Sequence, residues 1–151
     1  MQIYLLNRRF QQHQEIIWRG KGGVQDRTIY EDAEIFAYHL HESGLMSAEE
    51  FKTYRDLYLE FVQILPPPTL MIYLKADVDT LIDRIDRRGR PEERDIPREY
   101  LEKLHTLYES WFERYDRSPK LEIVVDHLDY VRSDADRNQL IQIIKSQLEL
   151  G

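Results

Sequence analysis

The sequence predicts an α/β protein with a parallel sheet and flanking helices. Residues 69–74 form a short, continuous apolar run whose length suits a buried strand, and residues 121–125 are a second buried-strand candidate. Segments with apolar residues at helical spacing lie before, between and after these runs. Such an alternation of strands and helices is typical of a parallel sheet. We expect a single domain over residues 1–151, because this length suits one hydrophobic core and neither a repeat nor a linker divides the chain.

The first half of the chain is predicted to be helical. Apolar residues at helical spacing indicate three helices: residues 2–17, residues 30–43, and a helix that begins after Ser47. The glycine-rich segment 19–23 separates the first two, and Gly44 is suited to end the second. Ser47 and Glu50 have the spacing of a capping box, and the prolines 66–68 end the third helix.

The second half is predicted to alternate between strands and helices. After the strand at 69–74, Asp77 is placed to cap a helix that runs into an arginine-rich segment. Pro97 suits the first turn of the next helix. The strand at 121–125 follows, and a C-terminal helix begins near Ser133.

Composition excludes several classes of function. With 28 Asp and Glu against 21 Lys and Arg, the net charge is -7, which argues against general nucleic-acid binding. The absence of cysteine excludes disulfides, cysteine-based zinc sites and thiol nucleophiles. No apolar run approaches the length of a membrane span, and the N-terminus has no signal-peptide pattern. We therefore expect a cytoplasmic protein with neither a membrane nor a nucleic acid as partner.

Arginines gather in one segment of this acidic chain. Six lie between residues 84 and 98: Arg84, Arg87, Arg88, Arg90, Arg94 and Arg98. The first three are spaced i, i+3 and i+4, so on a helix they share a face and can converge on one anion. One guanidinium group can bind two phosphate oxygens at once, and arginines stabilise the negative charge of a phosphoryl group during its transfer. The alternative is a solvated helix end that neighbouring carboxylates neutralise.

A second group of candidate residues is Asp26-Arg27-Thr28. Residues 24–29 could form a strand that ends where these three side chains face a ligand crevice. A carboxylate beside an arginine and a hydroxyl suits Mg²⁺ and a phosphate. An ion pair and a helix N-cap explain the same residues equally well.

Two other patterns do not indicate a phosphate-binding loop or a metal site. The glycine-rich segment lacks the G-x-x-x-x-G-K-[ST] spacing of a P-loop, because Lys21 is followed by Gly22 and no glycine lies at the required position upstream. His39 and His41 have the only close histidine spacing, and residues i and i+2 diverge on a helix. We interpret the five histidines as surface or packing residues.

Taken together, these segments resemble the deoxynucleoside kinase family, the kinases of deoxyadenosine, deoxyguanosine and deoxycytidine. The matching segments are Gln2–Arg9, Gln25–Asp32, Ile35–Ala37, Gly44–Met46 with Tyr54, Ile72–Leu74, Arg84–His105 and Asp126–Tyr130. They follow one another in order over nearly the whole chain. The resemblance implies a three-layer, parallel-sheet fold of the P-loop kinase type.

The resemblance also implies which residues bind the nucleoside. Gln2 and Asp32 match positions that hydrogen-bond the base, and Arg9 lies beside Asp32 to select the base edge. Phe36 matches the aromatic residue that stacks on the base, and Glu93 matches a contact to a sugar hydroxyl. The alternatives are a core position for Phe36 and a plain ion pair between Arg9 and Asp32.

The same resemblance implies a catalytic and donor-binding set. Arg27 matches an arginine near the 5′-hydroxyl, and Asp26 an acidic residue near Mg²⁺. The arginines that match those closing on the donor phosphates are Arg84, Arg88 and Arg90. The loop that holds the adenine of ATP is matched by Asp126, His127, Leu128, Asp129 and Tyr130. A structural alternative for Asp126 is a cap at the end of a strand.

Members of this family resemble the chain only after a leading segment with the first strand, the P-loop, its helix and the carboxylate that acts as base. We therefore expect an N-terminally truncated domain, the C-terminal two-thirds of the family fold, whose two central strands lack a neighbour.

The implied activity is transfer of the γ-phosphoryl group of ATP, with Mg²⁺, to the 5′-hydroxyl of a purine deoxynucleoside by a homodimer. The first alternative is an inactive fragment or non-catalytic relative that binds a nucleoside or a protein partner. A second is a nucleoside-monophosphate kinase.

Overall fold

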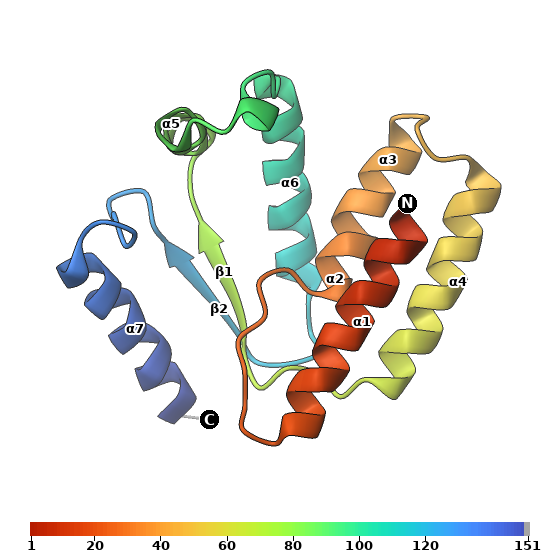
Figure 1. Ribbon diagram of the computed structural model, residues 1–151, viewed down its shortest axis with the longest axis horizontal. Helices are drawn as coiled ribbons and strands as arrows, with labels where there is room; N and C mark the ends of the chain where they lie inside the picture. Colours follow the sequence, from red (N-terminus) through yellow and green to blue (C-terminus); the bar gives the residue numbers. More distant parts are fainter. Residues whose placement is uncertain (150–151) are drawn as a thin grey trace. The chain divides into compact units, whose positions relative to one another are not determined.

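The computed structural model describes residues 1–149, which fall into two compact units. The first comprises Met1–Pro67 and Thr106–Trp111, and the second comprises Pro68–His105 and the chain from Phe112 onward. The elements in chain order (Figure 1) are α1 (Gln2–Arg19), α2 (Ile29–Glu31), the π-helix η1 (Asp32–Ala37), α3 (Tyr38–Glu42), α4 (Ala48–Ile64), β1 (Met71–Lys75), α5 (Val78–Arg88), the 3₁₀-helix η2 (Pro91–Glu93), α6 (Arg98–Arg114), β2 (Lys120–Val124) and α7 (Asp134–Glu149). Whether the whole chain acts as one domain stays a prediction.

Helix α1 confirms the first predicted helix and extends it to Arg19. Gly20 ends it in the left-handed conformation with φ 60°, which glycine adopts without a steric penalty. On the inner face Leu6 is fully buried. Farther along, the ring of Phe10 stacks on that of Phe61 in α4 at 4.1 Å. These contacts fix α1 against α4 within the first unit.

The predicted helix at 30–43 is present as three successive pieces, α2, η1 and α3. Ser43 is the C-cap, and Gly44 follows it with φ 71°. Gly44 therefore lies one residue beyond the cap, where a left-handed residue commonly reverses the chain after a helix.

Helix α4 begins and ends as the sequence predicts. The Ser47 hydroxyl accepts a hydrogen bond from the Glu50 N–H at 3.2 Å, and the Glu50 carboxylate accepts one from the Ser47 N–H at 2.9 Å. At the other end, Leu65 has extended backbone angles ahead of the prolines. These prolines lead into the second unit.

The second unit contains a parallel pair of strands, as predicted. Met71 pairs with Lys120, and the register continues to Lys75 opposite Val124. Both strands lie within one or two residues of the predicted apolar runs. Within residues 1–149 the sheet consists of these two strands. Helix α5 joins β1 to the segment before α6, and α7 follows β2, which is the α/β arrangement expected.

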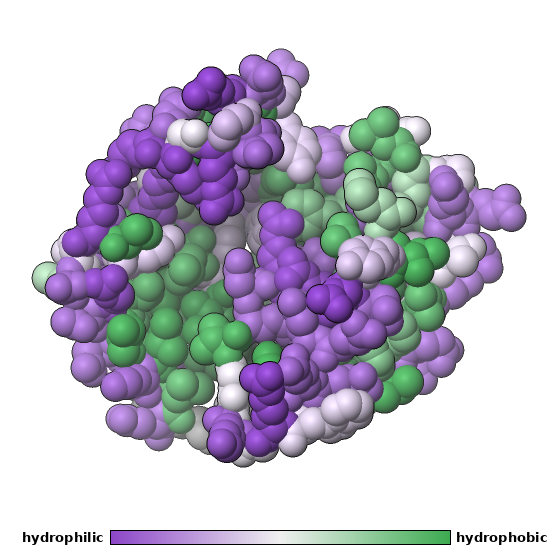
Figure 2. Space-filling model, viewed as in Figure 1, coloured by the Kyte–Doolittle hydropathy of each residue, from purple (hydrophilic) through white to green (hydrophobic). Residues whose placement is uncertain are grey.

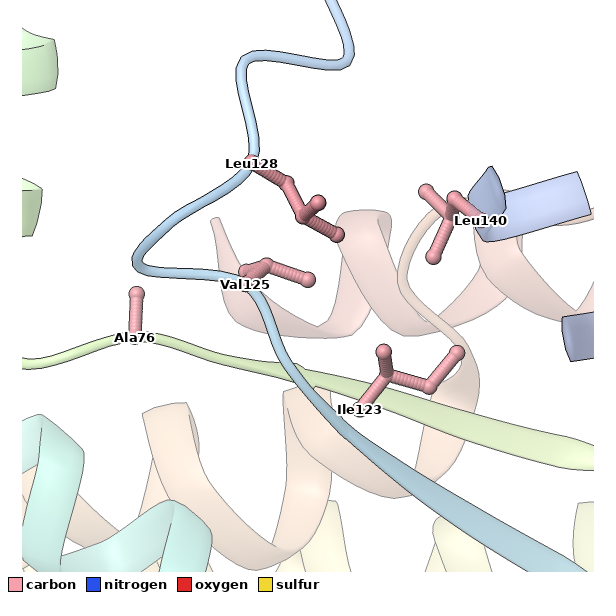
Figure 3. Close-up of a cluster of buried hydrophobic side chains, with 5 residues drawn as sticks. All are labelled: Ala76, Ile123, Val125, Leu128 and Leu140. Carbon is pink, nitrogen blue, oxygen red and sulfur yellow. The ribbon is translucent and has the colours of Figure 1, made fainter. Parts of the chain in front are cut away.

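A small hydrophobic core lies between the end of β2 and helix α7. Figure 3 shows the five buried side chains that form it: Ala76, Ile123, Val125, Leu128 and Leu140. Val125 and Leu128 are 1% and 5% exposed. Burial of an aliphatic side chain of this size contributes about 1.5–3 kcal/mol. Residues 125–128 are therefore part of the core as well as a connection between elements.

The strand expected at residues 24–29 is absent, and this prediction is wrong. Val24 is 98% exposed, and Thr28 begins helix α2 instead. A strand requires a neighbouring strand for its backbone hydrogen bonds, and within residues 1–149 the sheet consists of β1 and β2, with no strand paired to residues 24–29. The side chains of Asp26, Arg27 and Thr28 are therefore positioned by a turn and a helix cap.

Apolar side chains also reach the surface of the second unit. Figure 2 shows hydrophobic residues on the drawn face over the strands and α7. Exposed apolar residues in these elements are Leu74, Val124, Ile141, Ile143 and Leu148. None of the helices between residues 1 and 149 has the length and apolar character required to cross a membrane.

Candidate functional site

The centre of the candidate site in the first unit is a buried carboxylate paired with an arginine. The Arg9 Nε lies 3.3 Å from Oδ2 of Asp32, which is 5% exposed. The same guanidinium donates to the Gln12 side chain and to the Asp26 carbonyl, both at 3.2 Å. These bonds orient Arg9 so that one edge of its guanidinium faces Asp32.

Burial dominates the electrostatics of Asp32. It raises the pKa of the carboxyl above its usual range, and the charges of Arg9 and Arg27 offset part of that rise. A buried, charged carboxylate destabilises the fold unless a hydrogen-bond donor or a positive charge lies beside it. Such residues are concentrated at functional sites.

Phe36 and Arg27 complete this group. The Arg27 Cζ lies 4.2 Å from the centroid of the Phe36 ring, and the ring of Tyr108 meets Phe36 edge-on at 6.2 Å. Phe36 is half-buried, so its position is neither fully core nor fully surface. The Arg27 guanidinium covers one face of this ring, so a flat base stacks on Phe36 either at the opposite face or after Arg27 moves aside.

Local backbone structure positions these side chains. Thr28 caps α2: its hydroxyl accepts a hydrogen bond from the Tyr30 N–H at 3.1 Å, and the Glu31 carboxylate accepts one from the Thr28 N–H at 2.9 Å. Asp32 and Phe36 both lie on the π-helix η1, an element that is rare and frequently found at functional sites. Among residues 1–149, Arg27 is the only non-glycine residue with a positive φ, at 57°. Backbone strain of this kind also clusters at functional sites.

The remaining predicted residues of the first unit have simpler surroundings. Gln2 is the first residue of α1 and is half-buried. Asp26 is exposed, and Thr28 is occupied with capping, the structural alternative that the sequence left open. The structure thus brings Arg9, Asp32, Arg27 and Phe36 together.

A magnesium site cannot be assembled from protein ligands alone in the described residues. No group of three or more His, Asp and Glu side chains with suitable geometry is present between residues 1 and 149. Magnesium commonly takes one or two carboxylates and completes its shell with water and substrate phosphates. The exposed carboxylate of Asp26 fits that mode, in which nucleotide phosphates supply the other ligands.

In the second unit, Glu93 holds two of the predicted phosphate-binding arginines. Its carboxylate accepts a hydrogen bond from the Arg88 Nε at 2.8 Å, and Nη1 of Arg90 lies 3.5 Å from its other oxygen. Gly89, with φ 63°, ends α5 and lets the chain turn so that Glu93 comes back to Arg88. The side chains of Arg88 and Arg90 remain 48% and 62% exposed. Both guanidinium groups are therefore accessible to an anion that displaces Glu93.

Arg84 and Arg87 have other partners. Arg84 donates to the carbonyls of Val125 and Leu128, and Arg87 donates to the Asp83 carbonyl of its own helix at 3.2 Å. Convergence of Arg84, Arg87 and Arg88 on one anion is therefore not observed, although all three lie on α5. Helical spacing placed them on one helix face, but the side chains follow different acceptors.

The segment predicted to hold adenine, residues 126–130, is tied to both neighbouring helices. Asp126 Oδ1 accepts a hydrogen bond from the Asp77 N–H at 2.7 Å, so Asp126 caps α5 although Asp77 occupies the N-cap position. That hydrogen bond, as the largest cause, lowers the pKa of the Asp126 carboxyl. Farther along, the Asp129 N–H donates to Asp136 of α7 at 2.7 Å. The side chain of Asp126 therefore has the structural role that the sequence left open, whereas His127 is exposed.

The sequence did not indicate that Tyr54 lies near Asp32. Tyr54 is 1% exposed, and its hydroxyl has no hydrogen-bond partner among the described residues. Burial and the negative charge of Asp32 both raise the pKa of this phenol. It lines a pocket of about 30 Å³ together with Ala33, Glu34, Tyr38, Phe51, Arg55 and Tyr58. The family resemblance placed Tyr54 among the matching positions but assigned it no role.

Comparisons with known proteins give the family of this chain. A family model described as "Deoxynucleoside kinase" matches residues 1–149. The chain belongs to the deoxynucleoside kinase family. It is 40% identical over 149 residues to a deoxyadenosine kinase of Dictyostelium discoideum, in an alignment that covers 99% of this chain and 58% of the relative. It is also 36% identical to a deoxyadenosine/deoxycytidine kinase of Bacillus subtilis, with 97% and 68% covered.

Solved structures of the family have the same fold. A deoxyadenosine kinase from M. mycoides, determined with products dCMP and a flexible dCDP, matches with a TM-score of 0.79 and 31% identity, covering all of this chain and 73% of that one. The same enzyme with bound dCTP matches with a TM-score of 0.74. The predicted P-loop kinase fold is therefore confirmed. The chain spans little more than half the length of the Dictyostelium kinase.

Proposed function

We propose that this chain provides the nucleoside-binding and donor-binding parts of a deoxynucleoside kinase, which transfers the γ-phosphoryl group of ATP to the 5′-hydroxyl of a deoxynucleoside. The arrangement of Arg9, Asp32 and Phe36 carries this proposal. A carboxylate accepts hydrogen bonds and a guanidinium donates them, so the pair can recognise the polar edge of a base. The adjacent ring supplies a surface for stacking.

A purine deoxynucleoside is the proposed substrate. The Dictyostelium and M. mycoides relatives are both named deoxyadenosine kinases. Gln2, at the start of α1, is proposed as a further hydrogen-bonding group for the base, because an amide both donates and accepts.

Phosphoryl transfer depends on positioning and on stabilisation of negative charge, and the proposed roles of the charged residues follow from that requirement. Arg88 and Arg90 bind the donor phosphates, and Arg27 acts near the 5′-hydroxyl. Asp26 would hold Mg²⁺ jointly with the phosphates, and the ion neutralises charge on them. Glu93 is proposed to contact a sugar hydroxyl. Residues 126–130 are proposed to hold the adenine of ATP.

We also propose that the protein is a homodimer through α1. Apolar residues at both ends of this helix, 14 positions apart, are exposed: Ile3 and Tyr4, and then Ile17 and Trp18. Residues at multiples of seven lie on the same helix face. The face of Ile3 and Ile17 also holds Phe10, which packs on α4 of the same chain, so Tyr4 and Trp18 mark the face proposed to meet a second copy. Trp18→Glu is expected to yield a monomer in sedimentation analysis, and a wild-type monomer would contradict this proposal.

Calorimetric titration with the four deoxynucleosides, at millimolar concentration, tests the nucleoside site. A hydrogen bond to a charged group contributes about 1.5–3 kcal/mol, so Asp32→Asn is expected to weaken binding by about 10- to 150-fold. Glu34→Gln is the matched control, because Glu34 is an exposed carboxylate on the same π-helix. No heat from a folded wild-type sample, or equal loss in both variants, would contradict the proposal.

The second candidate function is binding without transfer. The 151 residues themselves contain no G-x-x-x-x-G-K-[ST] motif to hold the donor phosphates, so experiments on these residues must separate binding from transfer. The titration combined with an assay for a deoxynucleoside 5′-monophosphate separates the two functions: both bind the nucleoside, and only the kinase forms the product.

A further inference from the structure

Arg84 differs from the other arginines of α5 in what its guanidinium contacts. Its Nη2 donates to the carbonyl of Leu128 at 3.0 Å and to that of Val125 as well. The Arg84 Cζ also lies 5.5 Å from the centroid of the Tyr130 ring. All three contacts are to the segment between β2 and α7.

The surroundings of Arg84 indicate that its hydrogen bonds stabilise the fold. Its side chain is half-buried, whereas Arg87 and Arg88 on the same helix are exposed. Val125 is 1% exposed and Leu128 5%. The Val125 carbonyl also accepts a hydrogen bond from the Leu128 N–H at 3.2 Å, so the Leu128 carbonyl depends more on Arg84, and a buried carbonyl that loses its partner costs about 1–3 kcal/mol. A single guanidinium nitrogen, Nη2, donates to both carbonyls through its two N–H groups.

A second contact runs in the opposite direction between the same two segments. Asp126 caps the N-terminus of α5 through the Asp77 N–H, while Arg84 holds the carbonyls on either side of Asp126. Arg84 is one helical turn from Arg88, so the two contacts fix the helix that carries Arg88 relative to residues 125–130.

We propose that Arg84 is a positioning residue that holds residues 125–130 through their carbonyls, and that the donor phosphates are bound by Arg88 and Arg90 without it. The functional consequence of this role, the placement of the segment that holds adenine, rests on the proposed function. It replaces the phosphate contact that family resemblance implies for Arg84.

Hydrogen exchange tests the anchor without any nucleotide. The amides of Val125, Leu128 and Asp129 are all hydrogen-bonded and therefore protected. Arg84→Gln is expected to accelerate their exchange on the order of ten-fold, the effect of losing a hydrogen bond from a charged donor. Arg87→Gln, which removes the same charge from the same helix, is expected to leave them unchanged. Unchanged exchange in Arg84→Gln would overturn the proposal.

Binding of inorganic tripolyphosphate and of ATP to the 151-residue chain tests the functional consequence. Arg84→Gln is expected to weaken tripolyphosphate binding no more than Arg87→Gln does, yet to weaken ATP binding further. Arg88→Gln is expected to weaken both ligands to the same degree. Equal loss of tripolyphosphate binding in Arg84→Gln and Arg88→Gln would overturn the proposal.

Arg84→Lys serves as the second variant if Arg84→Gln does not fold. It keeps the charge, but its ammonium nitrogen lies one atom nearer the backbone than Nη2 and does not reach both carbonyls, so exchange at residues 125–129 is expected to rise while tripolyphosphate binding stays at the wild-type level. Exchange at the wild-type rate would show that charge alone is sufficient and would overturn the proposal. A wild-type chain that binds neither ATP nor tripolyphosphate would contradict the proposed function, and the exchange data would still decide on the anchor.

Discussion

Replacement of Glu93 by glutamine is expected to strengthen the binding of polyphosphates. In the ligand-free structure the Glu93 carboxylate already occupies the arginines that a phosphate would need, with Arg88 at 2.8 Å and Arg90 at 3.5 Å. An incoming anion must displace it. Glu93 therefore acts as an internal competitor for the proposed phosphate site.

The geometry gives the size of this effect. Arg88 and Arg90 are about half exposed, so solvent screens both pairs, and exposed ion pairs contribute about 0.2–1 kcal/mol each. The Arg88 pair, with two nitrogens on one oxygen, belongs near the top of that range, and the longer Arg90 pair near the bottom. A competitor of about 1 kcal/mol in total lowers the apparent affinity about five-fold.

Isothermal titration with tripolyphosphate at constant ionic strength measures the change. Glu93→Gln is expected to bind about five-fold more tightly than the wild type. Glu92→Gln is the matched control, since Glu92 is an exposed carboxylate in the same 3₁₀-helix and its replacement changes the long-range charge equally. Equal gains in the two variants would refute the reasoning, because the effect would then be one of net charge alone.

Three further expectations concern stability and turnover. Asp32→Asn is expected to raise the midpoint of thermal unfolding at pH 7, because burial raises the pKa of Asp32 and disfavours its charged form. This gain in stability should shrink as the pH falls through the raised pKa. A lower midpoint at pH 7 would contradict this. Asp126 has a lowered pKa, so its stabilisation is present above the pKa of the unfolded chain and is lost as the pH falls through the folded value. In thermal scans at pH 7 and at a pH below that folded value, Asp126→Asn should therefore lose stability only at pH 7, and an equal loss at both would contradict this. The 151-residue chain alone is expected to show no deoxynucleoside phosphorylation, whereas the chain preceded by a P-loop and a base carboxylate is expected to be active. One preorganised hydrogen-bond donor typically contributes a factor of ~10²–10³ to the rate, and a general base a factor of ~10²–10⁴. ATP-dependent formation of product by the short chain would contradict this.

The features that the sequence predicted well depend on neighbouring residues. The capping box at Ser47 and Glu50 and the proline end of α4 involve contacts within a few positions, so a local pattern is sufficient. The two strands were recognisable from their short, mostly apolar segments, although neither is buried on both faces, since Leu74 and Val124 are exposed. The Arg9–Asp32 pair followed from resemblance, since 23 residues separate its members.

The features that the sequence did not predict depend on distant partners. The partners of Arg84 are 41 and 44 residues away, and helical spacing says which face an arginine shares but not which carbonyls it meets. The strand at 24–29 was a wrong prediction because a local segment does not show whether a strand is available to pair with it. The π-helix that carries Asp32 and Phe36 has the same apolar periodicity as an α-helix, so the pattern indicated only a helix.

A crystal structure of the chain with deoxyadenosine tests the central claim most directly. We expect the base to stack on the Phe36 ring, with its polar edge toward Asp32 and Arg9 and with the ion pair between these two residues retained. A nucleoside bound elsewhere, or crystals soaked at saturating concentration that show no nucleoside beside Phe36, would contradict the account.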